Sequence, residues 1–133
     1  MYEYKCELIK VVDGDTIDVL IDVGFSTYRK ERVRLYGINT PECRTRNKEE
    51  KAKGLAAKQR LKEILKEFGK HFIIKTEIDK KGKFGRILGQ IFDLEMQSCA
   101  NDMLVIEGHA VEYFGGARWD KMSQIINFFN VII

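Results

Sequence analysis

Three short clusters of charged and polar residues have the types and spacing that chemistry requires. They are Asp13-Gly14-Asp15-Thr16, the run RLYGINTPE from Arg34 to Glu42, and Lys83-Phe84-Gly85-Arg86. Carboxylate and carbonyl oxygens are the ligands that hard divalent cations prefer. Arginine donates paired hydrogen bonds to a phosphate and stays charged at any working pH. Brought together, these groups could bind a phosphate and a metal ion.

Each cluster also has a plain structural interpretation. Asp-Gly is a tight-turn signal, an arginine in a strand can form an ordinary ion pair with a nearby carboxylate, and residues 83–86 could be a basic hairpin tip. An EF-hand loop starting at Asp13 is excluded, because its sixth position should be Gly and is Asp18, and its twelfth should be Glu and is Gly24. Spacing alone does not decide between these structural roles and a chemical one.

Apolar residues at a period of two predict the strands that position these clusters. We expect strands at residues 2–12, 17–22, 32–35, 72–78 and 87–92, with a hairpin turn at 80–83. Between residues 49 and 68 the apolar period becomes three or four, and Gly69 follows as a stop, which predicts a helix. Two further helices are expected, at residues 100–107 and after Arg118.

Three strands, a helix, two strands and C-terminal helices is the order of an OB-fold. We therefore expect an α+β protein that is mainly β, a five-stranded barrel with a helix between strands three and four. With 133 residues and no Pro/Gly/Ser-rich linker, the chain is expected to be one domain over residues 1–133.

The composition, with 44% hydrophobic and 32% charged residues, excludes a disordered chain. Three widely spaced cysteines (Cys6, Cys43, Cys99) disfavour a disulfide scaffold or a CxxC zinc site and indicate reduced thiols. No apolar run approaches the ~20 residues that span a bilayer, and charged residues interrupt the first twenty positions. We expect a cytoplasmic or phage-encoded intracellular monomer without a membrane partner, secreted only if a signal peptide was removed.

The net charge of +3 is unevenly distributed. Residues 44–86 hold 15 Lys or Arg against 6 Asp or Glu, whereas the remainder holds 8 against 14. Such a basic stretch can bind a polyanion. On charge alone, a solvated lysine-rich helix face is the more common explanation.

The motifs V-D-G-D-T, R-L-x-G-I-N-T-P-E and K-F-G-R, in this order and with a helix between the last two, resemble the staphylococcal nuclease-like (thermonuclease) family. The resemblance covers roughly residues 5–115. It implies an OB-fold and a calcium-dependent phosphodiesterase that acts on DNA and RNA. In the implied site, Ca²⁺ is held by Asp15, Asn39 and the Thr40 carbonyl, and Glu42 is the general base on the attacking water.

The same resemblance implies that Arg34 and Arg86 hold the phosphate and its developing charge. Elementary chemistry agrees, because phosphodiester hydrolysis spreads negative charge over oxygens that fixed cations stabilise. Residues expected to contact the substrate are two from the third motif and two aromatic residues near the end of the resemblance: Lys83, Phe84, Tyr113 and Phe114. For Tyr113 and Phe114, the sequence is consistent either with stacking on a nucleobase or with packing in the core.

Two residues depart from the family pattern. Asn39 stands where the family usually has aspartate, so the metal site has one negative charge fewer. Phe84 stands where the staphylococcal enzyme has tyrosine, so a ring remains but a hydroxyl is lost.

A non-catalytic nucleic-acid-binding domain is therefore the alternative function, although Arg34, Glu42 and Arg86 favour an enzyme. A protein-interaction domain has only the apolar segment 125–133 in its favour. His71 and His109 lack a metal-ligand partner at a suitable spacing, and we interpret them as structural and Cys43 as incidental.

Overall fold

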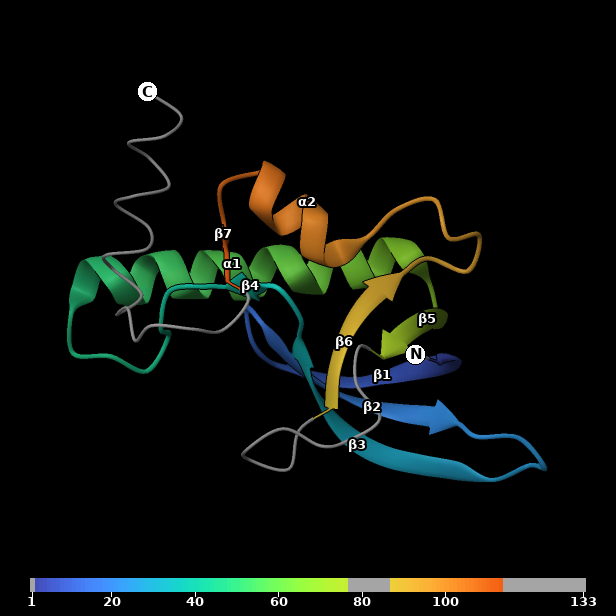
Figure 1. Cartoon of the computed structure of the whole chain (residues 1–133). Coiled ribbons are helices and arrows are strands. Elements are labelled where there is room, and N and C mark those ends of the chain that lie inside the picture. Colours follow the sequence, from blue (N-terminus) through green and yellow to red (C-terminus); the bar gives the residue numbers. More distant parts are fainter. Residues whose placement is uncertain (1, 77–86, 114–133) are drawn as a thin grey trace.

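Five strands with apolar inner faces close into a barrel in the order β1-β2-β3-β6-β5. The computed structural model describes residues 2–76 and 87–113, and Figure 1 shows the barrel beneath a long helix. All neighbours are antiparallel except β3 and β6, which are parallel. This mixed barrel confirms the predicted OB-fold. The barrel strands are β1 (Glu3–Asp13), β2 (Thr16–Asp22), β3 (Tyr28–Leu35), β5 (His71–Thr76) and β6 (Ile87–Phe92).

The predicted helix between the third and fourth barrel strands is confirmed as α1 (Lys48–Phe68). Asn47 caps its start, where its side-chain oxygen accepts hydrogen bonds from the amides of Glu49 and Glu50. Gly69 ends it with a φ of 99°, in the left-handed region that glycine tolerates. The residues that α1 buries fall at the predicted helical period, and they are Gly54, Ala57, Leu61, Ile64 and Leu65.

Two features extend beyond the sequence prediction. The third strand begins at Tyr28, so the hairpin that it forms with β2 is longer than expected. Asp18, on a strand face expected to be polar, is buried because Arg32 binds both of its carboxylate oxygens, at 2.8 and 3.2 Å. Arg32 holds the pKa of the Asp18 carboxyl below its ordinary value, mainly through this hydrogen bonding. The predicted turn at 80–83 and the predicted helix after Arg118 lie outside the described residues.

A small second sheet was not predicted. It consists of β4 (Ile38–Asn39) and β7 (Val111–Glu112), which pair antiparallel with Asn39 opposite Val111. The short helix α2 (Ala100–Ile106) precedes β7 and matches the predicted helix at 100–107. Among the described residues, no helix has the length and apolar character to cross a membrane.

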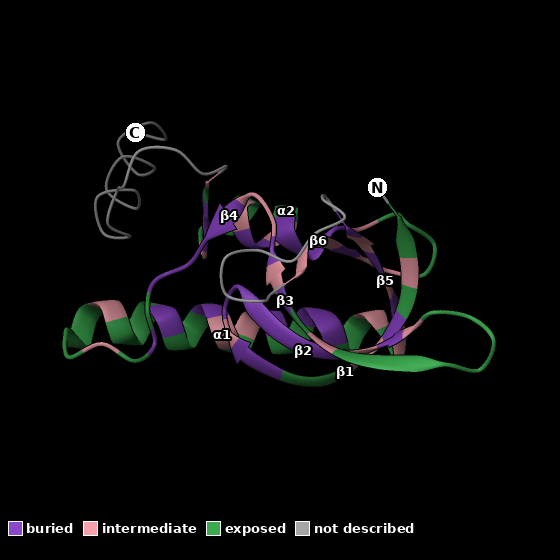
Figure 2. Ribbon diagram, turned by 60° about the horizontal axis from the view of Figure 1, so that its bottom comes forward, coloured by how far each residue is buried: buried purple, intermediate pink, exposed green. Residues whose placement is uncertain are grey.

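The buried residues lie on the barrel strands and on the two helices that pack against the barrel, and Figure 2 colours these parts of the ribbon purple. Some of the buried residues are polar, and one of them connects several elements. Asn101 in α2 is 1% exposed, and its amide nitrogen donates to the Tyr36 carbonyl at 2.8 Å and to the Gly89 carbonyl at 3.3 Å. Its oxygen accepts from the Ile91 amide at 3.1 Å. Asn101 therefore joins α2 to β6 and to the segment that leads into β4.

Candidate functional site

The turn between β1 and β2 and the short strand β4 meet at the Asp15 carboxylate. Asp15 is 4% exposed. One of its oxygens, Oδ2, accepts from the Thr40 amide at 3.2 Å and lies 3.5 Å from the Arg34 guanidinium. The other, Oδ1, accepts from the Thr16 hydroxyl at 3.2 Å. The first two motifs are thus joined in one buried polar cluster.

Arg34 is held in this cluster by three contacts. It is the second-last residue of β3 and pairs with Thr16 of β2. Besides the ion pair with Asp15, its guanidinium donates to the Leu35 carbonyl at 2.9 Å and to the Asn39 side-chain oxygen at 3.0 Å. Its side chain is only 15% exposed. The guanidinium is therefore fixed in orientation and reachable from solvent over a small area.

Gly14 allows the Asp13–Thr16 turn to approach α1 and β4. A Cβ at Gly14 would lie 2.8 Å from the Ala57 Cβ and 3.0 Å from the Thr40 hydroxyl. The Asp15 carbonyl also accepts from the Leu35 amide at 2.8 Å. The Asp-Gly pair therefore forms a tight turn, as its structural interpretation predicts. The same turn also places Asp15 in the candidate site.

The segment after Thr40 carries Glu42 on the surface. Pro41 is buried and Glu42 is exposed, and the Glu42 amide donates to a Glu50 carboxylate oxygen of α1 at 3.3 Å. Gly54 of α1 lies directly against this segment, because a Cβ there would fall 2.7 Å from the Pro41 carbonyl oxygen. The backbone that carries Glu42 is therefore held by α1.

Cys43 also holds this segment, in a role that the sequence did not reveal. Its thiol donates to a carboxylate oxygen of Asp13 at 2.8 Å. Burial first, and then this contact with Asp13, raise the pKa of the Cys43 thiol, so it remains a protonated donor at neutral pH. The interpretation of Cys43 as incidental is corrected by this hydrogen bond, which joins the Glu42 segment to the end of β1.

Of the predicted substrate contacts, Tyr113 is the one within the described residues. It is half-buried, and its amide donates to the Gly37 carbonyl at 2.8 Å. Lys83, Phe84, Arg86 and Phe114 lie outside the described residues, so their part in the site stays a prediction.

The oxygens in the cluster suit a hard cation. Asp15 offers a carboxylate, Asn39 an amide oxygen and Thr40 a carbonyl, and the buried Thr40 hydroxyl has no hydrogen-bond partner within residues 2–76 and 87–113. In the same part of the chain, no three His, Cys, Asp or Glu side chains gather as a metal-binding group. The cluster therefore fits an oxygen-ligated cation such as Ca²⁺, with a low ligand charge.

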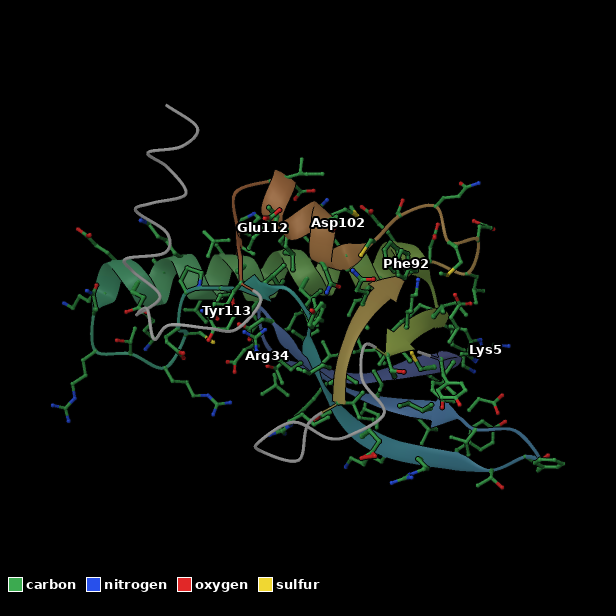
Figure 3. The ribbon with its side chains drawn as sticks, in the orientation of Figure 1. Lys5, Arg34, Phe92, Asp102, Glu112 and Tyr113 are labelled. Carbon is green, nitrogen blue, oxygen red and sulfur yellow. The ribbon has the colours of Figure 1, made fainter. Side chains whose placement is uncertain are left out.

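A separate pocket of about 300 Å³ lies between α2 and the β4–β7 sheet. Asp102 and Glu112 line it, and Figure 3 shows both on this side of the molecule. Two carboxylates disfavour a phosphate, so this pocket does not extend the cluster around Arg34.

Comparison with known proteins identifies the family. The profile of the staphylococcal nuclease homologues matches residues 32–128. The match includes Arg34, Asn39, Thr40 and Glu42 and begins after the Asp13–Thr16 turn. Protein ParB of Escherichia coli is 34% identical over 99 residues, which is 72% of this chain and 46% of that protein. The chain thus spans about half the length of this relative. It belongs to the family of staphylococcal nuclease homologues.

Proposed function

We propose that this protein is a metal-dependent nuclease that hydrolyses phosphodiester bonds in DNA or RNA. The observation that carries the proposal is the Arg34 guanidinium, fixed beside the Asp15 carboxylate and the Asn39 side-chain oxygen. The Thr40 amide donates to the same Asp15 carboxylate. A preorganised cation next to oxygen ligands for a metal is the arrangement that phosphoryl chemistry needs.

Arg34 would bind the non-bridging oxygens of the scissile phosphate. A guanidinium has five N–H donors, so it can bond to protein oxygens and still donate to a phosphate. Its contacts with Leu35 and Asn39 fix its orientation before the substrate arrives, which avoids reorganisation during the reaction. We assign the second phosphate-binding arginine to Arg86 by its position in the K-F-G-R motif.

The cation would be held by Asp15, Asn39 and the Thr40 carbonyl, and Ca²⁺ is the ion that we propose. When bound, it would supply positive charge beside the phosphate and lower the pKa of a bound water. Because the chain contributes one carboxylate to this set, the phosphate of the substrate is expected to supply a further negatively charged ligand.

Glu42 would remove the proton from the attacking water. Its side chain is exposed, as a base that must reach solvent water requires, while its backbone is held by Glu50, Gly54 and the Cys43–Asp13 hydrogen bond. A base held in this way keeps its position relative to Thr40, two residues earlier in the chain.

One observation favours the alternative, a nucleic-acid-binding protein without catalysis. Asn39 is neutral where the family usually has aspartate, and its oxygen already accepts a hydrogen bond from Arg34. If this contact prevents cation binding, the domain would bind nucleic acid without cleaving it.

The test is to incubate the purified protein with radiolabelled single-stranded DNA, and separately with RNA, in calcium or in a chelator. The proposal expects cleavage in calcium and none in chelator. In calcium, the Arg34→Gln variant should cleave about 100- to 1,000-fold more slowly than the wild type. Binding without cleavage in calcium, magnesium or manganese would establish the alternative.

A further inference from the structure

The surface of α1 is divided into two flanks of different charge. Lysines follow one another at intervals of three, seven, four and four residues, which places them along one side of a helix. They are Lys48, Lys51, Lys58, Lys62 and Lys66, here named the lysine flank. Lys58 is half-buried and the other four are exposed. Figure 2 shows that the first turns of α1 project beyond the barrel.

The carboxylates of α1 lie elsewhere. At 100° per residue, three of the carboxylates fall on the other flank, together with Arg60 and Lys53; they are Glu49, Glu63 and Glu67. The fourth, Glu50, accepts from the Glu42 amide. The Nε and one terminal nitrogen of the Arg60 guanidinium donate to the Glu107 carboxylate, just beyond the end of α2. The acidic flank therefore faces α2, and the lysine flank faces away from it.

Helix stability does not explain the lysine flank. Lys58, Lys62 and Lys66 form a series of like charges four residues apart, a spacing that destabilises a helix. Within the described parts of the chain, no ion pair joins any of the five lysines to a carboxylate. A solvated helix would be more stable with charges of both signs on this flank, as it has on the other.

The middle of the lysine flank lies next to the candidate site. Gly54, between Lys51 and Lys58, lies against the backbone of Glu42. Lys58 is close enough to Cys43 for its charge to lower the pKa of that thiol, against the larger opposing effect of burial. From Lys48 to Lys66 the flank is about 27 Å long, at about 1.5 Å per residue.

We propose that the lysine flank binds the backbone of a single-stranded nucleic acid whose scissile phosphate lies at Arg34. The inference rests on the proposed function and adds to it a surface that binds the substrate away from the scissile phosphate. Lysine is a flexible point charge, suited to phosphates without regard to sequence. A single strand can bend to present one phosphate to Arg34, whose side chain is 15% exposed, while its neighbours follow α1.

The experiment compares two charge-matched double variants. Lys51→Gln/Lys62→Gln removes two charges from the lysine flank. Lys5→Gln/Lys70→Gln removes two exposed charges elsewhere, and Figure 3 shows Lys5 at the other end of the barrel from Arg34. Binding of a fluorescent single-stranded oligonucleotide is titrated in chelator, so that no cleavage occurs, over a range of salt concentrations.

The flank variant should bind about 25-fold more weakly at 0.1 M salt, because each phosphate contact on a single strand changes affinity roughly as [salt]^−0.7. The slope of log affinity against log salt should become shallower by about 1.4. The control variant should bind like the wild type. The melting temperature of the flank variant should be unchanged or higher, since like-charge repulsion is relieved.

Cleavage separates this inference from the proposed function. In calcium, the flank variant should lose kcat/KM on a long single strand but retain it on a dinucleotide too short to reach α1. Equal binding by the flank and control variants, or tighter binding of a duplex than of the single strand, would overturn the inference even if the protein cleaves. If the wild type cleaves nothing but the flank variant still loses binding, the proposed function is overturned and the inference about the lysine flank stands.

Discussion

Gly54 of α1 and Glu42 are in direct backbone contact. A Cβ on Gly54 would lie 2.5 Å from the Glu42 carbonyl oxygen, closer than real side chains approach a backbone atom. Any other residue at position 54 must therefore move α1 away from the segment that carries the proposed general base. Glycine in the middle of a helix costs about 1 kcal/mol relative to alanine, and this contact accounts for that cost.

The first prediction follows from that contact. Gly54→Ala should lower kcat at least tenfold, because Glu42 is displaced, and destabilise the fold by about 1–3 kcal/mol, as overpacking does. Ala52→Gly, at an exposed position of the same helix, should cost about 1 kcal/mol of stability through propensity alone and leave kcat unchanged. Activity assays and urea denaturation of both variants make the comparison. Wild-type kcat in Gly54→Ala would show that this contact does not position Glu42.

The second prediction concerns the charged groups. Arg34→Gln and Glu42→Gln should each lower kcat about 100- to 1,000-fold while the protein stays folded, because each removes a group that acts in the transition state. Arg86→Ala should lose as much. Arg29→Gln, which removes an exposed ion pair with Glu31, is the control and should cleave normally. If Glu42→Gln cleaves DNA at the wild-type rate, another group is the base.

The third prediction concerns Asn39. Asn39→Asp should tighten Ca²⁺ binding to the free protein, because a second charged ligand adds attraction of roughly 4 kcal/mol at 4 Å before desolvation offsets much of it. Part of the gain is lost because Arg34, 3.0 Å away, would also bind the new carboxylate. Calorimetry on both forms, with and without a nucleotide bisphosphate, measures the effect. If the wild type without nucleotide already binds Ca²⁺ as tightly as the variant, residue 39 is not a ligand.

The fourth prediction concerns pH. The folded protein raises the pKa of the Cys43 thiol above its ordinary value of 9.0, so the thiol is more easily deprotonated in the unfolded chain. The stability that the protonated Cys43 thiol contributes is therefore fully present below pH 9. It is lost as the pH rises through the raised pKa of this thiol in the folded protein. Thermal melts from pH 7 to 11 should show a steeper alkaline decline in the wild type than in Cys43→Ala. Parallel profiles would mean that the Cys43–Asp13 hydrogen bond does not contribute.

The barrel and α1 could be predicted because their signals are local. Ala57, Leu61 and Ile64 recur at helical spacing, and Gly69 ends the helix where its φ of 99° requires a glycine. The family resemblance implied that Asp15 and Arg34 belong to one site, as metal ligand and phosphate-binding group. Their ion pair at 3.5 Å was not predicted.

Other parts of the site depend on contacts between distant residues, which leave no periodic pattern. The β4–β7 sheet pairs Asn39 with Val111, and two-residue strands are too short to show an alternation. Asn101 looks like any polar residue near the start of a helix, and only the closed barrel shows that it bonds to Tyr36. Gly54 is a weak signal of such a contact, because a glycine inside a helical pattern lowers the stability of the helix and so needs a reason in packing.

The pairing of β4 with β7 has a consequence for the order of folding. Asn39 pairs with Val111, which lies more than seventy residues further along the chain. The parallel pairing of β3 likewise cannot form until β6 has been synthesised. Contacts of such sequence separation form late and slow the folding of a domain. During synthesis, the nascent chain would carry Asp15, Arg34 and Glu42 long before it could assemble them. The candidate site would therefore be complete only in the last steps of folding, after β7 has left the ribosome.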